Sequence, residues 1–505
     1  MIVNDVQSYL NSRPFITGKG AAHSPLMIVA DFPDENDSRR KEPFSGPPGN
    51  MLDEMLKKAG SSLQQCFKTH AFQRQPPGGN IKLVPKGMIE EGKKYLWSEI
   101  EAIKPNCILA LGELALEACT NKKGLTEYRG SILQSIGLPK VVSTIHPRRL
   151  FLSSKEGGIG YEARTYVQLD INRAVEESKT STLDLPKRVL QVAKSAADLI
   201  NFRRQYADRK RAASDIEVKH CIPNCVSIAF DPWHSMSVPL FNPKGFPQFI
   251  PEYQYPDIYE CLYWIFQECE IIGQNWKFDS DKLDKIGLPT PKFYADTMLM
   301  AHVLHSELPK SLQFLTSIYT REPYYKSELK EFNYYKDDID KLFSYNAKDS
   351  AVTFEVYNAM VRDLIDLKFD TFYFNFQHKL HDLYRHIEMT GIKFDRKIQK
   401  ELWDQYGAHE ERLQKELDTL VDHPVNVGSP KQVKTLLFDE LGFPRRESTN
   451  EETLVALYGN HTTTPLKKKV IDLILELRGV RKAKGTYIPI EPDFDERVRF
   501  AYKIV

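Results

Sequence analysis

The sequence predicts an α/β protein with about three domains. In the first part of the chain, apolar runs that fit buried strands alternate with stretches of helical periodicity, which is typical of a parallel sheet covered by helices. These runs are 26–30, 107–111 and 140–144. A second group of apolar runs, 225–230, 237–241 and 271–275, predicts a mixed sheet with flanking helices. Beyond residue 365 the apolar spacing is mainly helical, and a length of 505 residues agrees with three domains.

The composition is that of a soluble globular protein, with 41% hydrophobic and 27% charged residues. The net charge of +1 means that a nucleic-acid partner would have to meet locally concentrated positive charge. The N-terminus has no signal pattern and no apolar run reaches eighteen residues, so no membrane partner is expected. The seven cysteines lack C-x-x-C spacing, which indicates a reducing compartment and a cytoplasmic protein.

The first domain is expected to span residues 1–178. In open α/β sheets, ligand-binding groups gather at the carboxyl ends of the strands. Asp31, His70 and His146 lie at such positions in the predicted sheet. We therefore expect a binding pocket at this edge.

Several stretches between residues 20 and 152 resemble the uracil-DNA glycosylase superfamily, nearest to its iron–sulfur members. They are Ala30–Pro33, Pro43–Gly49, Leu52–Asp53, Thr69–His70, Pro76–Pro77, Leu109–Gly112, Arg129–Gly130 and Thr144–Pro147. The resemblance implies a glycosylase-like parallel α/β domain with a pocket formed by Asp31, Phe44, His70 and His146. Phe44 would be the ring that stacks on a flipped base.

Two departures from the family pattern affect this pocket. Asp31 stands where the family usually has Glu, and His70 replaces the Asn that would contact the edge of a flipped uracil. The four cluster cysteines are also absent, so no iron–sulfur cluster is expected. Two interpretations stay open for this domain: uracil excision, or a retained scaffold that binds DNA or a replication partner.

Residues 179–186 are expected to form a polar linker to a second domain at 187–365. The most informative residues of this domain are acidic. Asp215 and Glu217 lie two positions apart on a predicted strand, so both side chains point to the same face. Asp279 comes shortly after another predicted strand.

A further acidic position lies on a predicted helix. Tyr345 and Asp349 are four positions apart and therefore share one face of that helix. If the fold brings Asp349 together with Asp215, Glu217 and Asp279, the four carboxylates are too costly to bury without cations. Carboxylate oxygens favour Mg²⁺, with Mn²⁺ as an alternative. Two such ions about 3.5–4 Å apart are typical of phosphodiester cleavage.

Each of these acidic motifs alone is common on solvated surfaces, but their order resembles the DEDDy 3′–5′ exonuclease domain of family A DNA polymerases. The matching positions are Asp215 and Glu217, then Asn275, Phe278 and Asp279, then Tyr345 and Asp349. The resemblance covers about residues 187–365 and implies an RNase H-like mixed-sheet exonuclease domain. It also implies that the four carboxylates bind two metal ions, with Asp215 bridging both, and that Tyr345 positions the nucleophilic water.

Residues 366–505 resemble the start of the polymerase region of family A enzymes, a mainly helical thumb that grips primer–template DNA. The matching stretches are Met389–Asp395, Asn426–Gln432, Leu436–Phe438, Leu441–Pro444, Leu477–Arg478, Arg481–Lys482 and Thr486–Tyr487. The segment 467–487 contains seven basic residues and only two acidic ones, an excess of positive charge that suits contacts with phosphates. The expected DNA-binding residues are Lys467, Lys468, Arg478, Arg481, Lys482 and Lys484.

This order of three domains resembles polymerases of certain large bacterial viruses, and a phage protein would act in the host cytoplasm. In the family, the palm and fingers that add nucleotides would follow residue 505. The chain alone is therefore not expected to polymerise, whether it is truncated or one half of a split polymerase with a separate palm–fingers chain. We predict Mg²⁺-dependent removal of 3′-terminal nucleotides from single-stranded or frayed DNA. The alternative of another class is a non-catalytic DNA-binding clamp.

Overall fold

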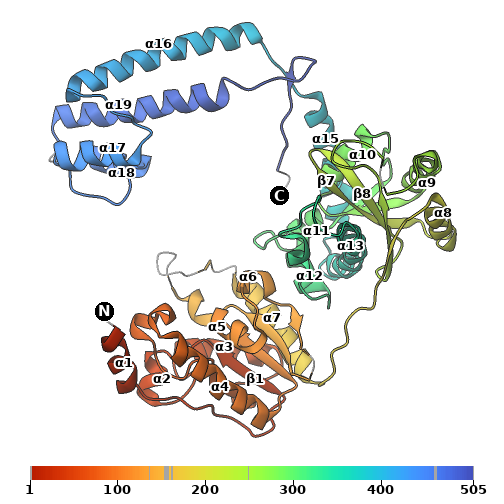
Figure 1. Cartoon of the computed structure of the whole chain (residues 1–505), viewed down its shortest axis with the longest axis vertical. Helices are drawn as coiled ribbons and strands as arrows, with labels where there is room; N and C mark the ends of the chain where they lie inside the picture. Colours follow the sequence, from red (N-terminus) through yellow and green to blue (C-terminus); the bar gives the residue numbers. More distant parts are fainter. Residues whose placement is uncertain are drawn as a thin grey trace. The chain divides into compact units, whose positions relative to one another are not determined.

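The computed structural model divides into two units, Met1–His381 with Ile504–Val505, and Asp382–Lys503 (Figure 1). The structure describes residues 3–135, 137–152, 159–160, 163–247, 249–459, 463–503 and 505. Each unit is described by itself below. No helix in this described part is both long and apolar enough to cross a membrane.

The first domain of the larger unit contains a five-stranded sheet of order β2-β1-β3-β5-β4. The strands are β1 (Leu26–Ala30), β2 (Phe67–His70), β3 (Cys107–Leu111), β4 (Ile132–Leu133) and β5 (Lys140–Thr144). All pairs are parallel except β4 with β5. Every residue of β1, β3 and β5 is buried, as expected for strands covered on both faces. The predicted parallel α/β domain is confirmed, with one short antiparallel strand added at its edge.

Helices flank this first sheet (Figure 1). They are α1 (Val3–Ser12), α2 (Glu35–Arg40), α3 (Pro47–Lys58), α4 (Lys86–Ile103), α5 (Glu113–Thr120), α6 (Leu125–Tyr128) and α7 (Ala163–Ser178). Of these, α5 and α7 pack on β1, β3 and β5, while α4 packs on β2. The apolar side chains of the strands and helices form one core.

The second sheet has six strands in the order β11-β10-β7-β8-β9-β6. They are β6 (Val189–Val192), β7 (Arg211–Lys219), β8 (Ile222–Ala229), β9 (His234–Pro239), β10 (Glu270–Gly273) and β11 (Phe293–Asp296). The strands β7, β8 and β9 form an antiparallel meander, and the other pairs are parallel. The predicted mixed sheet is therefore confirmed.

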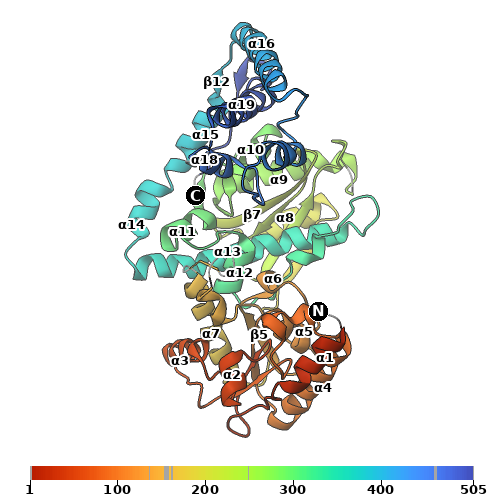
Figure 2. The ribbon, with the colours of Figure 1, turned by 90° about the vertical axis from the view of Figure 1, so that its left-hand side faces the viewer.

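The strand β7 separates two apolar cores. Its residues Ala212 and Ile216 belong to the core that includes α8 (Ala196–Gln205) and α9 (Tyr255–Glu268). Ala213 belongs to the core that includes the long helix α13 (Asp340–Asp366), which packs across β7, β8 and β9 (Figure 2). The remaining helices of this domain are α10 (Trp276–Lys285), α11 (Thr297–Leu304), α12 (Leu312–Tyr319) and α14 (Asp370–Phe372).

The smaller unit is mainly helical, as predicted, and has its own core. Its elements are α15 (Leu380–Thr390), β12 (Ile392–Lys393), α16 (Arg396–Val421), α17 (Pro430–Lys434), α18 (Glu451–Tyr458), α19 (Pro465–Lys482) and β13 (Arg497–Val498). Gly391 takes a positive φ of 65° directly after α15, a conformation that favours glycine. The carboxylate of Asp395 then accepts the amide protons of Lys397 and Ile398 and caps α16.

Candidate metal centre

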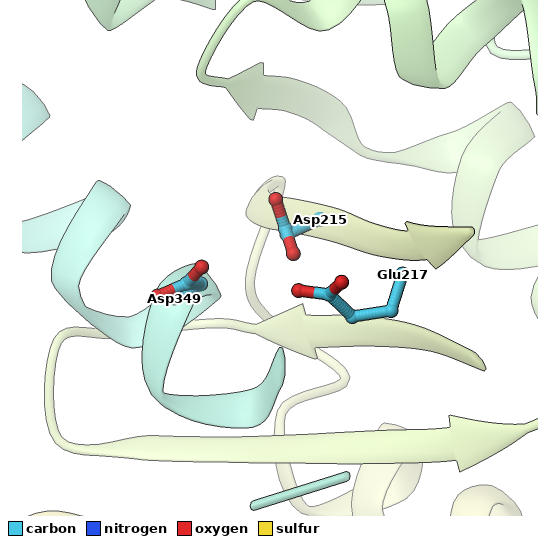
Figure 3. Close-up of side chains that lie close together, drawn as sticks. All are labelled: Asp215, Glu217 and Asp349. Atoms are coloured by element: carbon cyan, nitrogen blue, oxygen red, sulfur yellow. The ribbon is translucent and has the colours of Figure 1, made fainter. Parts of the chain in front are cut away.

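The two acidic residues of β7 face the long helix α13. Asp215 and Glu217 alternate along the strand with Ile216, whose side chain enters the opposite core. Figure 3 shows both carboxylates pointing into the space beside α13, where Asp349 projects toward them. The two-residue spacing predicted this shared face.

Small polar residues of the sheet hold α13 at close range. The hydroxyl of Ser235 donates to the carbonyl oxygen of Ala347 at 2.7 Å, and that of Ser227 donates to the carbonyl oxygen of Asn346 at 2.8 Å. Ser237 donates to the side-chain oxygen of Asn346 at 2.8 Å. Each serine is buried and small enough to let the helix backbone approach the strands. These contacts fix the helix turn that carries the site residues.

Three carboxylates converge at this helix–strand contact. Asp215, Glu217 and Asp349 each offer one oxygen, and these oxygens all lie within 4.8 Å of one another. Burial, followed by the negative charges of Asp349, Asp279 and Glu217, raises the pKa of Asp215 well above its usual range. Burial and the charge of Asp349 raise the pKa of Glu217 to about 7. The amide of Asn346 donates to Asp215 Oδ2 at 2.9 Å and orients that carboxylate.

Asp279 lies beside these three carboxylates, but it is not one of the residues whose oxygens all lie within 4.8 Å of one another. The pairing of β10 with β7 ends at Ala213, which leaves the amide of Ile216 without a strand partner on that edge. Asp279, on the first turn of α10, accepts this amide proton through Oδ1 at 3.1 Å. Its carboxylate is buried, and burial raises its pKa well above the usual range.

Tyr345 lies one helix turn before Asp349 and only 8% of it is exposed. Burial and the charge of Asp349, with smaller contributions from Glu217 and Asp215, raise the pKa of its phenol above the usual value. The phenol is therefore protonated at neutral pH. Its ring meets that of Tyr325 edge to face, with centroids 5.7 Å apart.

Two residues absent from the sequence-based prediction engage Asp349 directly. The phenol of Tyr325 donates to Asp349 Oδ1 at 2.6 Å, and the ammonium of Lys326 forms an ion pair with Oδ2. Both precede α13 by more than a dozen residues and lie in an irregular segment that contains one short 3₁₀ turn, Lys326–Leu329. No helical or strand spacing relates them to Asp349, so the sequence offered no periodic signal.

The donor set fits hard divalent cations. All three converging ligand groups are carboxylates, of which Asp349 is buried and the other two are half-buried, and Lys326 offsets their mutual repulsion only in part. Mg²⁺ and Mn²⁺ favour such oxygen donors. Lys326 shows that a positive charge is already accommodated at this position.

A second candidate site lies in the first domain. A cavity of about 620 Å³ is lined by Asp31, Phe44 and His146, among other residues. The Asp31 carboxylate sits so close to Gly112 that a Cβ there would lie 2.3 Å from Oδ2, and Gly112 has a positive φ of 112°. Burial raises the pKa of Asp31 to about 6.

The two histidines predicted for this pocket have different positions. His146 Nδ1 accepts the amide proton of Arg148 at 3.1 Å, so the neutral ring carries its proton on Nε2. Burial lowers the pKa of His146 to about 4. His70, which was predicted to belong to this pocket, is not among the residues that line the cavity; it is buried, its ring lies parallel to Phe44 at 5.6 Å, and Nε2 points to Asp37, 3.4 Å away.

The basic residues predicted to bind DNA lie along α19 and the turn after it. Three of the six form hydrogen bonds or ion pairs inside the smaller unit. Arg478 donates to the carbonyl oxygens of Val427 and Thr449. Arg481 and Lys484 share the carboxylate of Glu410 at 2.9 and 3.1 Å. Glu410, on α16, therefore offsets part of the predicted excess of positive charge.

The other three basic residues have fewer constraints. Lys467 and Lys468 place their ammonium groups over the rings of Phe443 and Tyr458, at 5.0 and 5.2 Å from the centroids. Such contacts leave the ammonium group accessible to an anion. Lys482 is exposed.

Comparisons with known proteins agree with this architecture. A family profile described as the Uracil DNA glycosylase superfamily matches residues 17–166. The Type-4 uracil-DNA glycosylase of Thermotoga maritima is 29% identical over 168 residues, which are 33% of this chain and 84% of that protein. DNA polymerase I of Borreliella burgdorferi is 27% identical over 227 residues, which are 43% of this chain and 24% of that protein. The DNA polymerase of Bacillus phage SP01 is 27% identical over 215 residues, 43% of this chain and 21% of that protein.

The N-terminal part of the chain is thus a uracil-DNA glycosylase-like domain. The chain also has DNA polymerase I homologues, and the two findings together fit a part of a family A DNA polymerase. The matches of this chain span about a quarter or less of the length of the Borreliella burgdorferi and Bacillus phage SP01 polymerases.

Proposed function

We propose that the chain supplies the 3′–5′ exonuclease of a family A DNA polymerase and removes 3′-terminal nucleotides from DNA during replication. The observation that carries this proposal is the convergence of Asp215, Glu217 and Asp349 where β7 meets α13. Asp279 adjoins them, and Tyr345 lies on the same helix face as Asp349. The polymerase homologues support a role connected with DNA synthesis.

The carboxylates would hold divalent ions. Asp215, Glu217 and Asp349 would bind one Mg²⁺, and Asp279 would support a second together with Asp215. Mn²⁺ would suit the same oxygen donors. Bound ions would activate a water molecule and stabilise charge on the scissile phosphate. Asn346 keeps the Asp215 carboxylate oriented, since its amide donates to Oδ2.

Tyr345 would position the attacking water. Because its pKa lies above the usual value, the phenol keeps its proton at neutral pH. It would therefore act through hydrogen bonding to water rather than as a base. Its burial beside Asp349 limits the positions it can adopt.

The substrate we propose is a single-stranded or frayed 3′ end, with the adjoining duplex bound by the smaller unit. Lys467, Lys468 and Lys482 are the strongest candidates for phosphate contacts, because Arg478 and Arg481 have internal partners. A separate palm–fingers chain would be the partner for polymerisation.

The test is digestion of a 3′-labelled single strand by the full chain with Mg²⁺. We expect stepwise loss of 3′ nucleotides, and we expect Asp215→Ala/Glu217→Ala to abolish it. Asp208→Ala removes an exposed carboxylate outside the cluster and serves as the matched control. Digestion that persists in the double variant would exclude this site. DNA binding without any digestion by the wild type would favour the non-catalytic clamp.

A second candidate function is uracil excision by the first domain. The cavity lined by Asp31, Phe44 and His146, together with the glycosylase family match, favours it. Neutral His146 would donate a hydrogen bond from Nε2 to a base carbonyl, while Phe44 supplies an aromatic wall. Release of free uracil from a uracil-containing oligonucleotide, lost in His146→Ala, would support this activity. Absence of release would leave the domain as a scaffold.

A further inference from the structure

The irregular segment between α12 and α13 places a positive charge inside the proposed exonuclease site. The ammonium of Lys326 pairs with Asp349 Oδ2. The Lys326 side chain is 20% exposed and that of Asp349 only 5%, so the pair is shielded from bulk water. Asp349 Oδ1 is engaged as well, by the phenol of Tyr325 at 2.6 Å. Both oxygens of this carboxylate therefore already accept a hydrogen bond.

The Lys326 ammonium is held by aromatic faces rather than by other acids. It lies 4.6 Å from the ring centroid of Tyr345 and 5.3 Å from that of Tyr325. Cation–π contacts of this kind stabilise a charge without neutralising it. The same ammonium lowers the pKa of Asp215 and of Glu217, against the stronger effect of burial. Its field thus reaches all three converging carboxylates.

A divalent ion and Lys326 would compete for the same carboxylate. An ion bound by Asp215, Glu217 and Asp349 needs at least one oxygen of Asp349. Oδ1 already accepts from Tyr325 and Oδ2 from Lys326, and each oxygen keeps a second lone pair with which it can bind a metal ion. The ion pair is the contact that breaks, because the ammonium and a divalent ion on the same shielded carboxylate repel each other, whereas the neutral phenol of Tyr325 carries no charge.

We propose that Lys326 is a built-in counter-cation that occupies the carboxylate cluster before metal binding and leaves Asp349 when a divalent ion arrives. Lys326 is a positioning residue that sets the metal concentration at which the site assembles. This inference rests on the proposed exonuclease function. It differs from an ion pair that only orients Asp349 for the metal in the sign of one effect: loss of an orienting pair would weaken metal binding, whereas loss of a competitor strengthens it.

The test is Mn²⁺ binding to the full chain, measured by isothermal titration calorimetry without DNA. We expect Lys326→Met to bind Mn²⁺ roughly tenfold more tightly than the wild type, a coupling of ordinary size. Lys326→Arg keeps the charge and should stay near wild-type affinity. Lys348→Met is the matched control, because Lys348 also lies over the Tyr325 ring but pairs with Glu328 outside the cluster.

A second readout follows from the same competition. In EDTA, Lys326→Met should unfold at a lower temperature than the wild type, because its carboxylates lose their counter-charge. Saturating Mn²⁺ should remove this difference. Lys326→Gln repeats the test with a polar side chain in case the methionine variant does not fold. Unchanged or weaker Mn²⁺ affinity in the neutral variants would overturn the inference.

Failure of the inference and failure of the proposed function give different results. If the wild type binds no Mn²⁺, or Asp215→Ala/Glu217→Ala binds it equally well, the metal centre itself is wrong. If the wild type binds Mn²⁺ through these carboxylates and the neutral variants show no tighter binding, only the role of Lys326 is wrong.

Discussion

Tyr345 illustrates how one phenol can matter to a site made of carboxylates. Its raised pKa keeps the hydroxyl protonated, so the group can donate to water beside Asp349. Tyr345→Phe should leave the fold intact and lower the rate of the proposed exonuclease about 100-fold, the loss expected when a reacting water is misplaced. Single-turnover digestion of a labelled strand measures this. Tyr335→Phe, at a tyrosine that is 68% exposed, should have no effect. Equal rates for both variants would contradict the role of Tyr345.

Glu217 gives the metal-free protein a defined pH dependence. Its folded-state pKa is raised to about 7, from about 4.3 in an unfolded chain. The folded state therefore holds this proton more tightly, and the resulting stability is present below pH 4 and lost as the pH rises toward 7. In EDTA the melting temperature should fall by about 3 °C or more between pH 5.5 and 8.

Mg²⁺ should reduce this pH dependence, because it binds the ionised carboxylates. Glu217→Gln should flatten it without metal, whereas Glu252→Gln, at an exposed position, should not. The measurement is the melting temperature of the wild type and of both variants at several pH values. The same steep fall in Glu217→Gln would show that other groups cause it.

Local spacing explains which site residues could be predicted. Asp215 with Glu217, and Tyr345 with Asp349, follow strand and helix periods, and the structure puts each pair on one face. Lys326 approaches Asp349 through an irregular segment, so no period connects them. Tertiary contacts of this kind appear only when the fold is known.

At the scale of elements, the contact between α13 and the second sheet determines whether the carboxylates meet. Ser235 is fully buried, and its hydroxyl donates to the carbonyl oxygen of Ala347. Ser235→Val should push the helix away and destabilise the protein by about 1–3 kcal/mol, the usual cost of overpacking. Displacement of Asp349 should also lower the rate of the proposed exonuclease. Ser235→Ala keeps the volume small and should cost less than ~1.5 kcal/mol.

Urea unfolding and digestion assays on both serine variants test this contact. A valine variant that is as stable and active as the alanine variant would show that the helix tolerates a larger gap. The expected contrast depends on volume, since both substitutions remove the same hydroxyl.

Elements with a strong apolar period were predictable, and those fixed by neighbours were not. The bounds of β1, β3 and β5 match the predicted runs because both faces of these strands are buried. The two-residue strand β4 has too few residues to show a pattern. The position of α10 depends on Asp296 at the end of β11. The Asp296 carboxylate accepts the amide protons of Asn275 and Trp276 at the start of α10. The spacing of residues around Asp279 therefore does not predict that Asp279 lies beside the cluster.

On the scale of the larger unit, a buried ion pair connects its two domains. Arg129 pairs with Asp170 inside the first domain, and its guanidinium also donates to the hydroxyl of Ser317 in the second at 3.2 Å. Arg173 donates to the carbonyl oxygen of Gly130 in the first domain and to that of Ile318 in the second, at 2.8 and 2.9 Å. Asp170 in turn accepts the hydroxyl proton of Thr144 at 2.6 Å. The glycosylase-like domain thus shares polar contacts with the domain that carries the carboxylates.

This network predicts that the two domains unfold together. Arg129→Met leaves Asp170 buried without its cation, which typically costs 3–5 kcal/mol. Tryptophans report on both sides: Trp97 lies in the first domain and Trp276 in the second. In urea, single-tryptophan versions should give coincident transitions, and Arg129→Met should move both to lower urea. Lys285→Met breaks a surface pair with Asp281 and should change stability by less than about 1 kcal/mol. If Arg129→Met shifts only the Trp97 transition, the domains fold independently and the contacts of Arg129 with Ser317 contribute little.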